Sequence, residues 1–94
     1  MWPVWFGYES TGRMHRGQAI DLCEQGVSFT VESDQCPSVG DHVMTRFSFP
    51  LVDRDAFEME SYRDWGQVVS VIDAPGGRQR VSMRLNNPVA MAVA

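Results

Sequence analysis

The clearest pattern in the chain is an alternation of apolar and polar residues on both sides of one glycine. Ile20 and Leu22 carry the apolar positions before Gly26, and Phe29 continues them after it. A period of two is typical of strands with one buried face, and a glycine between two such runs indicates a hairpin. The two runs share a face if residues 24–27 form a four-residue loop, so we expect that loop, with a positive φ at Gly26.

The polar side of this predicted hairpin offers candidate chemistry. It carries a carboxylate, a thiol and two hydroxyls, from Asp21, Cys23, Ser28 and Thr30. Beside a turn with exposed amides, these groups could contact a polar ligand. A structural role for Asp21 is the alternative, because an aspartate before a turn often accepts hydrogen bonds from loop amides. The residues alone leave both roles open.

Alternation and, at residues 65–72, a high density of valines predict four further strands. The six predicted strands are residues 3–8, 17–23, 27–32, 42–49, 65–72 and 80–85. Pro50 is expected to end the fourth strand, and residues 51–63 stay open between a loop, a helical turn and a ragged strand. Short strands without a confident helix indicate an all-β fold. We predict a single domain over residues 1–94, built as a small six-stranded antiparallel β-barrel that closes to hide its edges.

The apolar faces of these strands predict the core. We expect buried side chains at Phe29, Phe47, Val69, Val71, Val81 and Met83. Base stacking was the alternative for the aromatic residues, but without a basic groove they are interpreted as core residues. These aromatic residues are Trp2, Trp5, Phe6, Phe47, Phe49 and Trp65.

Composition narrows the classes of function. With 44% hydrophobic and 11% aromatic residues, the chain is typical of a folded globule and not of a disordered segment. The net charge is −4, which argues against DNA or RNA as a partner. All eight basic residues are arginines. A small anionic ligand stays open, because one or two well-placed arginines suffice to bind it.

Nothing in the sequence points to catalysis or to a bound metal. The side chains that could hold zinc, His15, Cys23, Cys36 and His42, lack the short spacings of a zinc site. As a nucleophile Cys23 is disfavoured, because Asp21 opposes thiolate formation. There is also no glycine-rich phosphate loop. We therefore expect a binding protein without cofactor or metal, and not an enzyme.

The sequence shows no recognisable targeting signal. The first residues lack the basic and apolar regions of a signal peptide, and no stretch approaches the ~20 apolar residues of a membrane span. The two cysteines are interpreted as free thiols in a reducing compartment. The sequence therefore predicts a cytoplasmic protein without membrane insertion.

The segment Asp21–Gly26 resembles the D/N-x-S-x-x-G element of PilZ domains, the bacterial readers of the second messenger cyclic di-GMP. The resemblance extends to the order of the elements around it: a Pro/Gly-rich loop leading to residues 39–43, then strands at 65–69 and 81–85. It implies a PilZ-like barrel that acts as a regulatory binding module in cyclic di-GMP signalling. It also implies that Asp21, Cys23 and Gly26 contact the ligand.

Two departures from the family pattern bear on ligand binding. Cys23 stands where the family has serine, and a thiol is a poorer hydrogen-bonding group. The family's R-x-x-x-R element lies on a loop before the first strand, whereas this chain begins almost at that strand. Arg13 and Arg16 are the nearest cations in sequence to Asp21, and we expect one of them to pair with phosphate. Their spacing differs from the family's, and they follow the first predicted strand.

Two interpretations of the missing element stay open: the polypeptide is a piece of a longer one, or it is a divergent PilZ domain that lost the nucleotide. In either case we expect weakened binding of cyclic di-GMP. The alternative function is a nucleotide-independent interaction domain that binds a protein partner and regulates pili, flagella or secretion.

Overall fold

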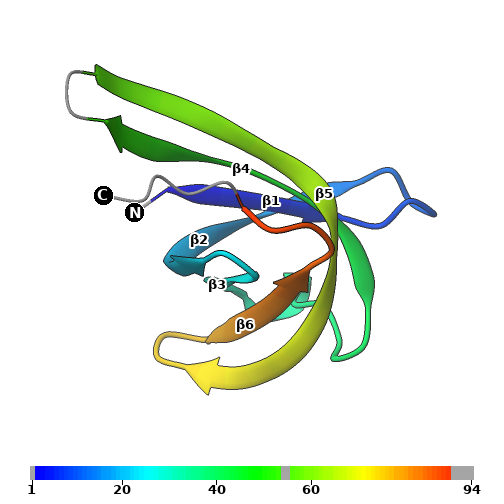
Figure 1. Ribbon diagram of the computed structural model, residues 1–94. Coiled ribbons are helices and arrows are strands. Elements are labelled where there is room, and N and C mark those ends of the chain that lie inside the picture. Colours follow the sequence, from blue (N-terminus) through cyan, green and yellow to red (C-terminus); the bar gives the residue numbers. More distant parts are fainter. Residues whose placement is uncertain (1, 54–55, 90–94) are drawn as a thin grey trace.

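Six antiparallel strands form a closed barrel in the order β1-β2-β3-β6-β5-β4 (Figure 1). The computed structural model describes residues 2–53 and 56–89, and only the backbone for 51–53 and 56–58. The strands are β1 (Pro3–Gly7), β2 (Met14–Cys23), β3 (Gly26–Glu32), β4 (His42–Asp53), β5 (Ala56–Ala74) and β6 (Arg78–Leu85). A 3-10 turn at Ser33–Gln35 is the only helical element in these residues. The predicted six-stranded antiparallel barrel is confirmed.

Alternation places the core on the inner side of the strands. On β3 the side chains of Val27, Phe29 and Val31 are buried, while Ser28 and Thr30 face outward. Of the predicted core residues, four are at most 2% exposed: Phe29, Phe47, Val81 and Met83. Another, Val71, is partly buried and packs against the core. The two-residue period was therefore sufficient to identify the buried side chains wherever strand pairing is uninterrupted.

The prediction that Val69 is buried is wrong, because β5 contains a bulge. Val68 pairs with Met83, but the next paired residue is Ser70, so Val69 is an extra residue in the strand. Its side chain is 50% exposed, whereas that of Val68 is 1% exposed. An extra residue shifts the inward and outward positions by one, which local alternation cannot reveal.

A second bulge corrects the face assigned to Ile20. The register of β2 against β3 shifts between Ala19 and Asp21, which makes Ile20 the extra residue. Ile20 is 44% exposed, and Ala19 takes the inward position with 3% exposure. Leu22, beyond the bulge, packs partly against the core as predicted.

The β2–β3 turn is tighter than predicted. Cys23 pairs with Gly26, so the loop consists of two residues and not four. The predicted positive φ at Gly26 is also wrong; the glycines with positive φ in the described residues are Gly12, Gly40, Gly76 and Gly77. Glycine is required at position 26 because a residue with a side chain would not fit there. A Cβ at this position would lie 2.6 Å from the backbone oxygen of Met83 on β6.

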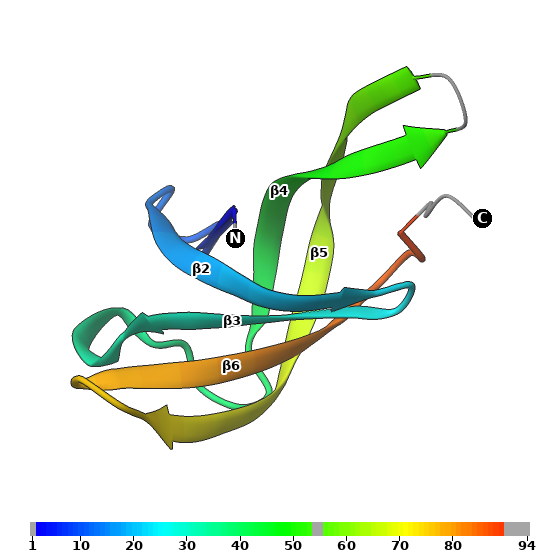
Figure 2. The ribbon, with the colours of Figure 1, turned by 90° about the vertical axis from the view of Figure 1, so that its left-hand side faces the viewer.

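The segment left open at residues 51–63 belongs to two long strands. β4 continues through Pro50 to Asp53, and β5 begins at Ala56, so the expectation that Pro50 ends the strand is wrong. β1 pairs with β4 only from Met44 to Phe47. Beyond Phe47 none of the described strands pairs with this edge of β4, and proline is tolerated at such an edge. The β4–β5 hairpin therefore projects past the barrel (Figure 2).

The end of β1 is tied to the loop before β4 by a tyrosine. The Tyr8 hydroxyl donates a hydrogen bond to the Asp41 carboxylate, which also accepts one from the backbone N–H of Ser38 at 3.0 Å. Burial, followed by the hydrogen bond to Asp41, raises the pKa of Tyr8 to about 12. The neutral phenol is therefore the form that the fold stabilises.

Candidate functional site

The outer face of β2, β3 and β6 gathers the polar side chains that the sequence singled out. Asp21 on β2 lies opposite Ser28 on β3, and Ser28 lies opposite Ser82 on β6. The hydroxyl oxygens of Ser28 and Ser82 are 3.1 Å apart and share a hydrogen bond. Neighbouring strands are ~4.8 Å apart, so these three residues form a continuous polar row across the sheet.

Asp21 is exposed and only lightly engaged. One carboxylate oxygen accepts a hydrogen bond from the backbone N–H of Leu22 at 2.9 Å. The predicted structural role required bonds from loop amides, but this donor is the adjacent strand residue. The carboxylate thus lies on the surface beside the two serines of the polar row, where it can accept hydrogen bonds from a ligand.

Gly26 lies between Cys23 and Arg84 on the same outer face. It pairs with Cys23 on one side and with Arg84 on the other. The Cys23 sulfur lies 3.9 Å from the position that a Cβ at Gly26 would occupy. The backbones of Cys23 and Arg84 are therefore ~10 Å apart across the sheet, on either side of Gly26.

Sequence reasoning missed the arginines of β6. Arg80 and Arg84 are four residues apart on one strand and therefore share its outer face, with Ser82 between them. Arg80 pairs with Thr30, and Arg84 pairs with Gly26. The signal was present in the sequence, because residues 80–84 have the spacing R-x-x-x-R. The family's element lies before the first strand, so its pattern alone does not point to a strand near the end of the chain.

Neither Arg13 nor Arg16 lies near Asp21. Arg13 is in the loop between β1 and β2, and Arg16 is near the start of β2, whereas Asp21 is near its end. Figure 2 shows the β1–β2 loop and the β2–β3 turn at opposite ends of β2. The five residue steps from Arg16 to Asp21 span roughly 16 Å along the strand. Arg16 instead stacks on Trp5, with its guanidinium carbon 5.9 Å from the ring centroid.

The two cysteines are free thiols in different environments. Cys23 is exposed, while Cys36 is half-buried. Burial raises the pKa of the Cys36 thiol. Among the described residues, no three His, Cys, Asp or Glu side chains gather closely enough to hold a metal ion. The same part of the chain contains no helix with the length and apolar character needed to cross a bilayer.

Comparisons with known proteins support the fold. No protein-family model matches the chain, and no curated protein matches it in sequence. The chain is similar to a solved structure from Bacillus subtilis, the inhibitor of motility MotI/DgrA, with a TM-score of 0.71 and 10% sequence identity. The similarity covers 95% of this chain and 40% of that chain, so this chain spans less than half the length of that protein. At this identity the likeness shows the fold.

Proposed function

We propose that this chain is a regulatory binding module of the PilZ type, and not an enzyme, that binds cyclic di-GMP on the outer face of β2, β3 and β6. The observation that carries the proposal is the face that Asp21, Gly26 and Arg84 share. The PilZ-like element of residues 21–26 and the barrel support it. The similarity to the fold of a protein named as an inhibitor of motility agrees with a regulatory role.

The chemistry of this face suits the ligand. Cyclic di-GMP carries two phosphodiester charges and two guanines, so a receptor needs cationic donors together with an acceptor for the guanine N–H groups. Arg84 and Arg80 can supply the donors, because guanidinium groups bind phosphate oxygens in a two-pronged geometry. Asp21 supplies the acceptor. The arginine pair on β6 takes over the role that the family gives to a loop before the first strand.

Cys23 sets an upper limit on the affinity. A thiol replaces the serine hydroxyl of the family element, and it donates and accepts only weak hydrogen bonds. A neutral hydrogen bond contributes a net ~0.5–1.5 kcal/mol, so Cys23→Ser should tighten cyclic di-GMP binding by roughly two- to tenfold. Non-specific binding would not become tighter when one sulfur atom is replaced by oxygen.

Calorimetric titration with cyclic di-GMP tests the proposal. A charge-assisted hydrogen bond contributes ~1.5–3 kcal/mol, so Arg84→Ala and Asp21→Ala should each weaken binding by about tenfold or more. Arg13→Ala is the matched control, because it removes the same charge at the other end of β2. If Arg13→Ala weakens binding as much as Arg84→Ala, the assigned site is wrong. If neither the natural chain nor Cys23→Ser binds, direct nucleotide recognition is refuted.

The second candidate function is a nucleotide-independent interaction domain that regulates pili, flagella or secretion. It is favoured by a second exposed surface, on the far side of the barrel, where arginine and tryptophan side chains gather. The two functions predict opposite results in the titration, since an interaction domain needs no nucleotide.

A further inference from the structure

A row of arginines crosses β2, β1, β4 and β5, centred on the side of the barrel opposite β3 and β6. The register places Trp5 of β1 between Arg16 of β2 and Arg46 of β4, and Arg46 lies opposite Arg63 of β5. We call these four residues the arginine row. Strands lie ~4.8 Å apart, so the row is about 15 Å long. Its members come from four strands, and no two of them are neighbours in sequence.

The charges of the arginine row are not balanced within the described side chains. Arg46 and Arg63 lie directly opposite each other, and like charges in such a pair repel. The ion pair that the structure gives in this part of the chain, Arg78–Glu32, involves no member of the row. The chain as a whole has a net charge of −4. A concentration of positive charge on an acidic protein indicates a surface for an anionic partner.

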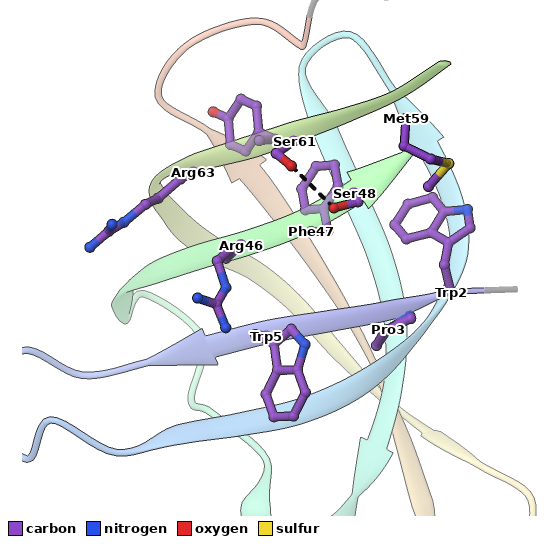
Figure 3. A pocket seen from close by; sticks show the side chains of 10 residues that line it. Trp2, Pro3, Trp5, Arg46, Phe47, Ser48, Met59, Ser61 and Arg63 are labelled. Carbon is purple, nitrogen blue, oxygen red and sulfur yellow. Dashed lines mark hydrogen bonds between the residues drawn. The ribbon is translucent and has the colours of Figure 1, made fainter. Parts of the chain in front are cut away.

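A hollow of about 450 Å³ adjoins the arginine row (Figure 3). Trp5, Arg46 and Arg63 line one end of it, while Trp2 and Met59 lie at the other end. Met59 is 54% exposed. Among the aromatic residues interpreted as core, Phe6, Phe47 and Phe49 are buried, and Trp2 is partly buried and packs against the core. The interpretation is wrong for Trp5 and Trp65, which are only partly buried and lie outside the core. One end of the hollow is cationic and the other is apolar.

The floor of the hollow is firmly held. Phe47 stacks between Trp2 and Tyr62, with ring centroids 5.4 Å and 5.1 Å apart. The Tyr62 hydroxyl donates a hydrogen bond to the backbone carbonyl of Asn87 at 2.8 Å. These contacts fix the aromatic rings in place, so a partner would lose little free energy to ordering them.

We propose that the arginine row and the hollow dock an acidic, extended segment of a partner protein. On an extended segment, side chains on one face recur every ~6.7 Å, so three glutamates or aspartates match a row of about 15 Å. A single phosphate can contact only part of the arginine row. Arg, Trp and Met are also the residue types enriched where protein partners bind. A large apolar side chain of the segment packs against Trp2 and Met59 in the hollow.

This inference does not depend on nucleotide binding. The arginine row is centred on β1 and β4, whereas the face of Asp21 extends over β3 and β6 on the opposite side of the closed barrel. The two surfaces share only β2, on which Arg16 and Asp21 lie roughly 16 Å apart. Loss of one binding activity therefore leaves the other intact, and the two proposals fail separately.

The test uses a fluorescent synthetic peptide in which three glutamates alternate with serines and a pair of leucines follows. We expect it to bind, and Arg46→Ala and Arg63→Ala each to weaken binding by about two- to fivefold, as for exposed ion pairs. Arg13→Ala is the control for net charge. Replacing the glutamates by lysines should abolish binding, and replacing the leucines by serines should weaken it. In nuclear magnetic resonance spectra, the indole N–H signals of Trp2 and Trp5 should shift, and the amide signals of Ser28 and Ser82 should not.

Three results would overturn the proposal. The first is equal peptide binding by the chain and by its Arg46→Ala/Arg63→Ala double variant. The second is full displacement of the peptide by millimolar inorganic phosphate, which would show a small-anion site. The third is self-association of the chain that the double variant abolishes, which would make a second copy the occupant. Circular dichroism of each variant confirms that it is folded.

Discussion

The bulge in β5 gives the sharpest test of the fold, because it reverses the roles of two adjacent valines. The side chain of Val68 is 1% exposed and that of Val69 is 50% exposed. Val→Ala removes two methyl groups, each contributing ~0.8 kcal/mol when buried, and an unfilled cavity adds to this loss. Val68→Ala should therefore lower the free energy of unfolding by about 2–3 kcal/mol. Val69→Ala should lower it by less than about 1 kcal/mol.

The two variants are matched controls for each other, since they have the same composition and alter the same strand. Urea unfolding followed by tryptophan fluorescence measures both, with the slope checked for a common denatured state. Without the bulge, period-two alternation places Val69 in the core and Val68 on the surface. A larger loss for Val69→Ala than for Val68→Ala would refute the register shift and the assignment of the outer face of β5.

Three further predictions follow from individual contacts. Gly26→Asn should destabilise the protein as much as Gly26→Val, by about 1–3 kcal/mol, because any Cβ at this position meets the Met83 carbonyl. A much smaller loss for the Asn variant would instead indicate a positive φ at Gly26. Phe47→Ala should cost about 3–5 kcal/mol in urea unfolding, since its ring is 2% exposed, and a loss below 1 kcal/mol would contradict that burial. The folded-state pKa of Tyr8, about 12, lies above the usual value of 10, so its contribution to stability is complete below pH 10 and is lost toward pH 12. The Tyr8→Phe variant should therefore lose less stability between pH 10 and pH 12 than the natural protein. Parallel curves of unfolding free energy against pH for the two proteins would contradict this prediction.

Much of the fold could be predicted because its signals are local. The alternation of Val27, Phe29 and Val31 with polar residues identifies β3 and its buried face without any knowledge of its neighbours. The turn before β6 is likewise signalled by Pro75 and the glycines that follow it. The sequence by itself therefore determined the number of strands, the barrel class and most of the core.

Pairing between strands decided the rest. Whether Ile20 or Val69 is an extra residue depends on the partner strand, because a bulge is a property of two strands and not of one. The extension of β4 past Pro50 likewise depends on where β1 stops pairing. Local alternation carries no information about either.

The two surfaces proposed for binding were also decided by the tertiary structure. Arg84 follows Gly26 by 58 positions, yet the β3–β6 register makes them direct neighbours. In the same way, barrel closure brings Arg16, Arg46 and Arg63 into one row around Trp5. A sequence specifies which face of a strand a side chain occupies, because that depends on the two-residue period of the strand itself. Which charges then lie side by side depends on strand order and register, and these are fixed only when the whole barrel packs.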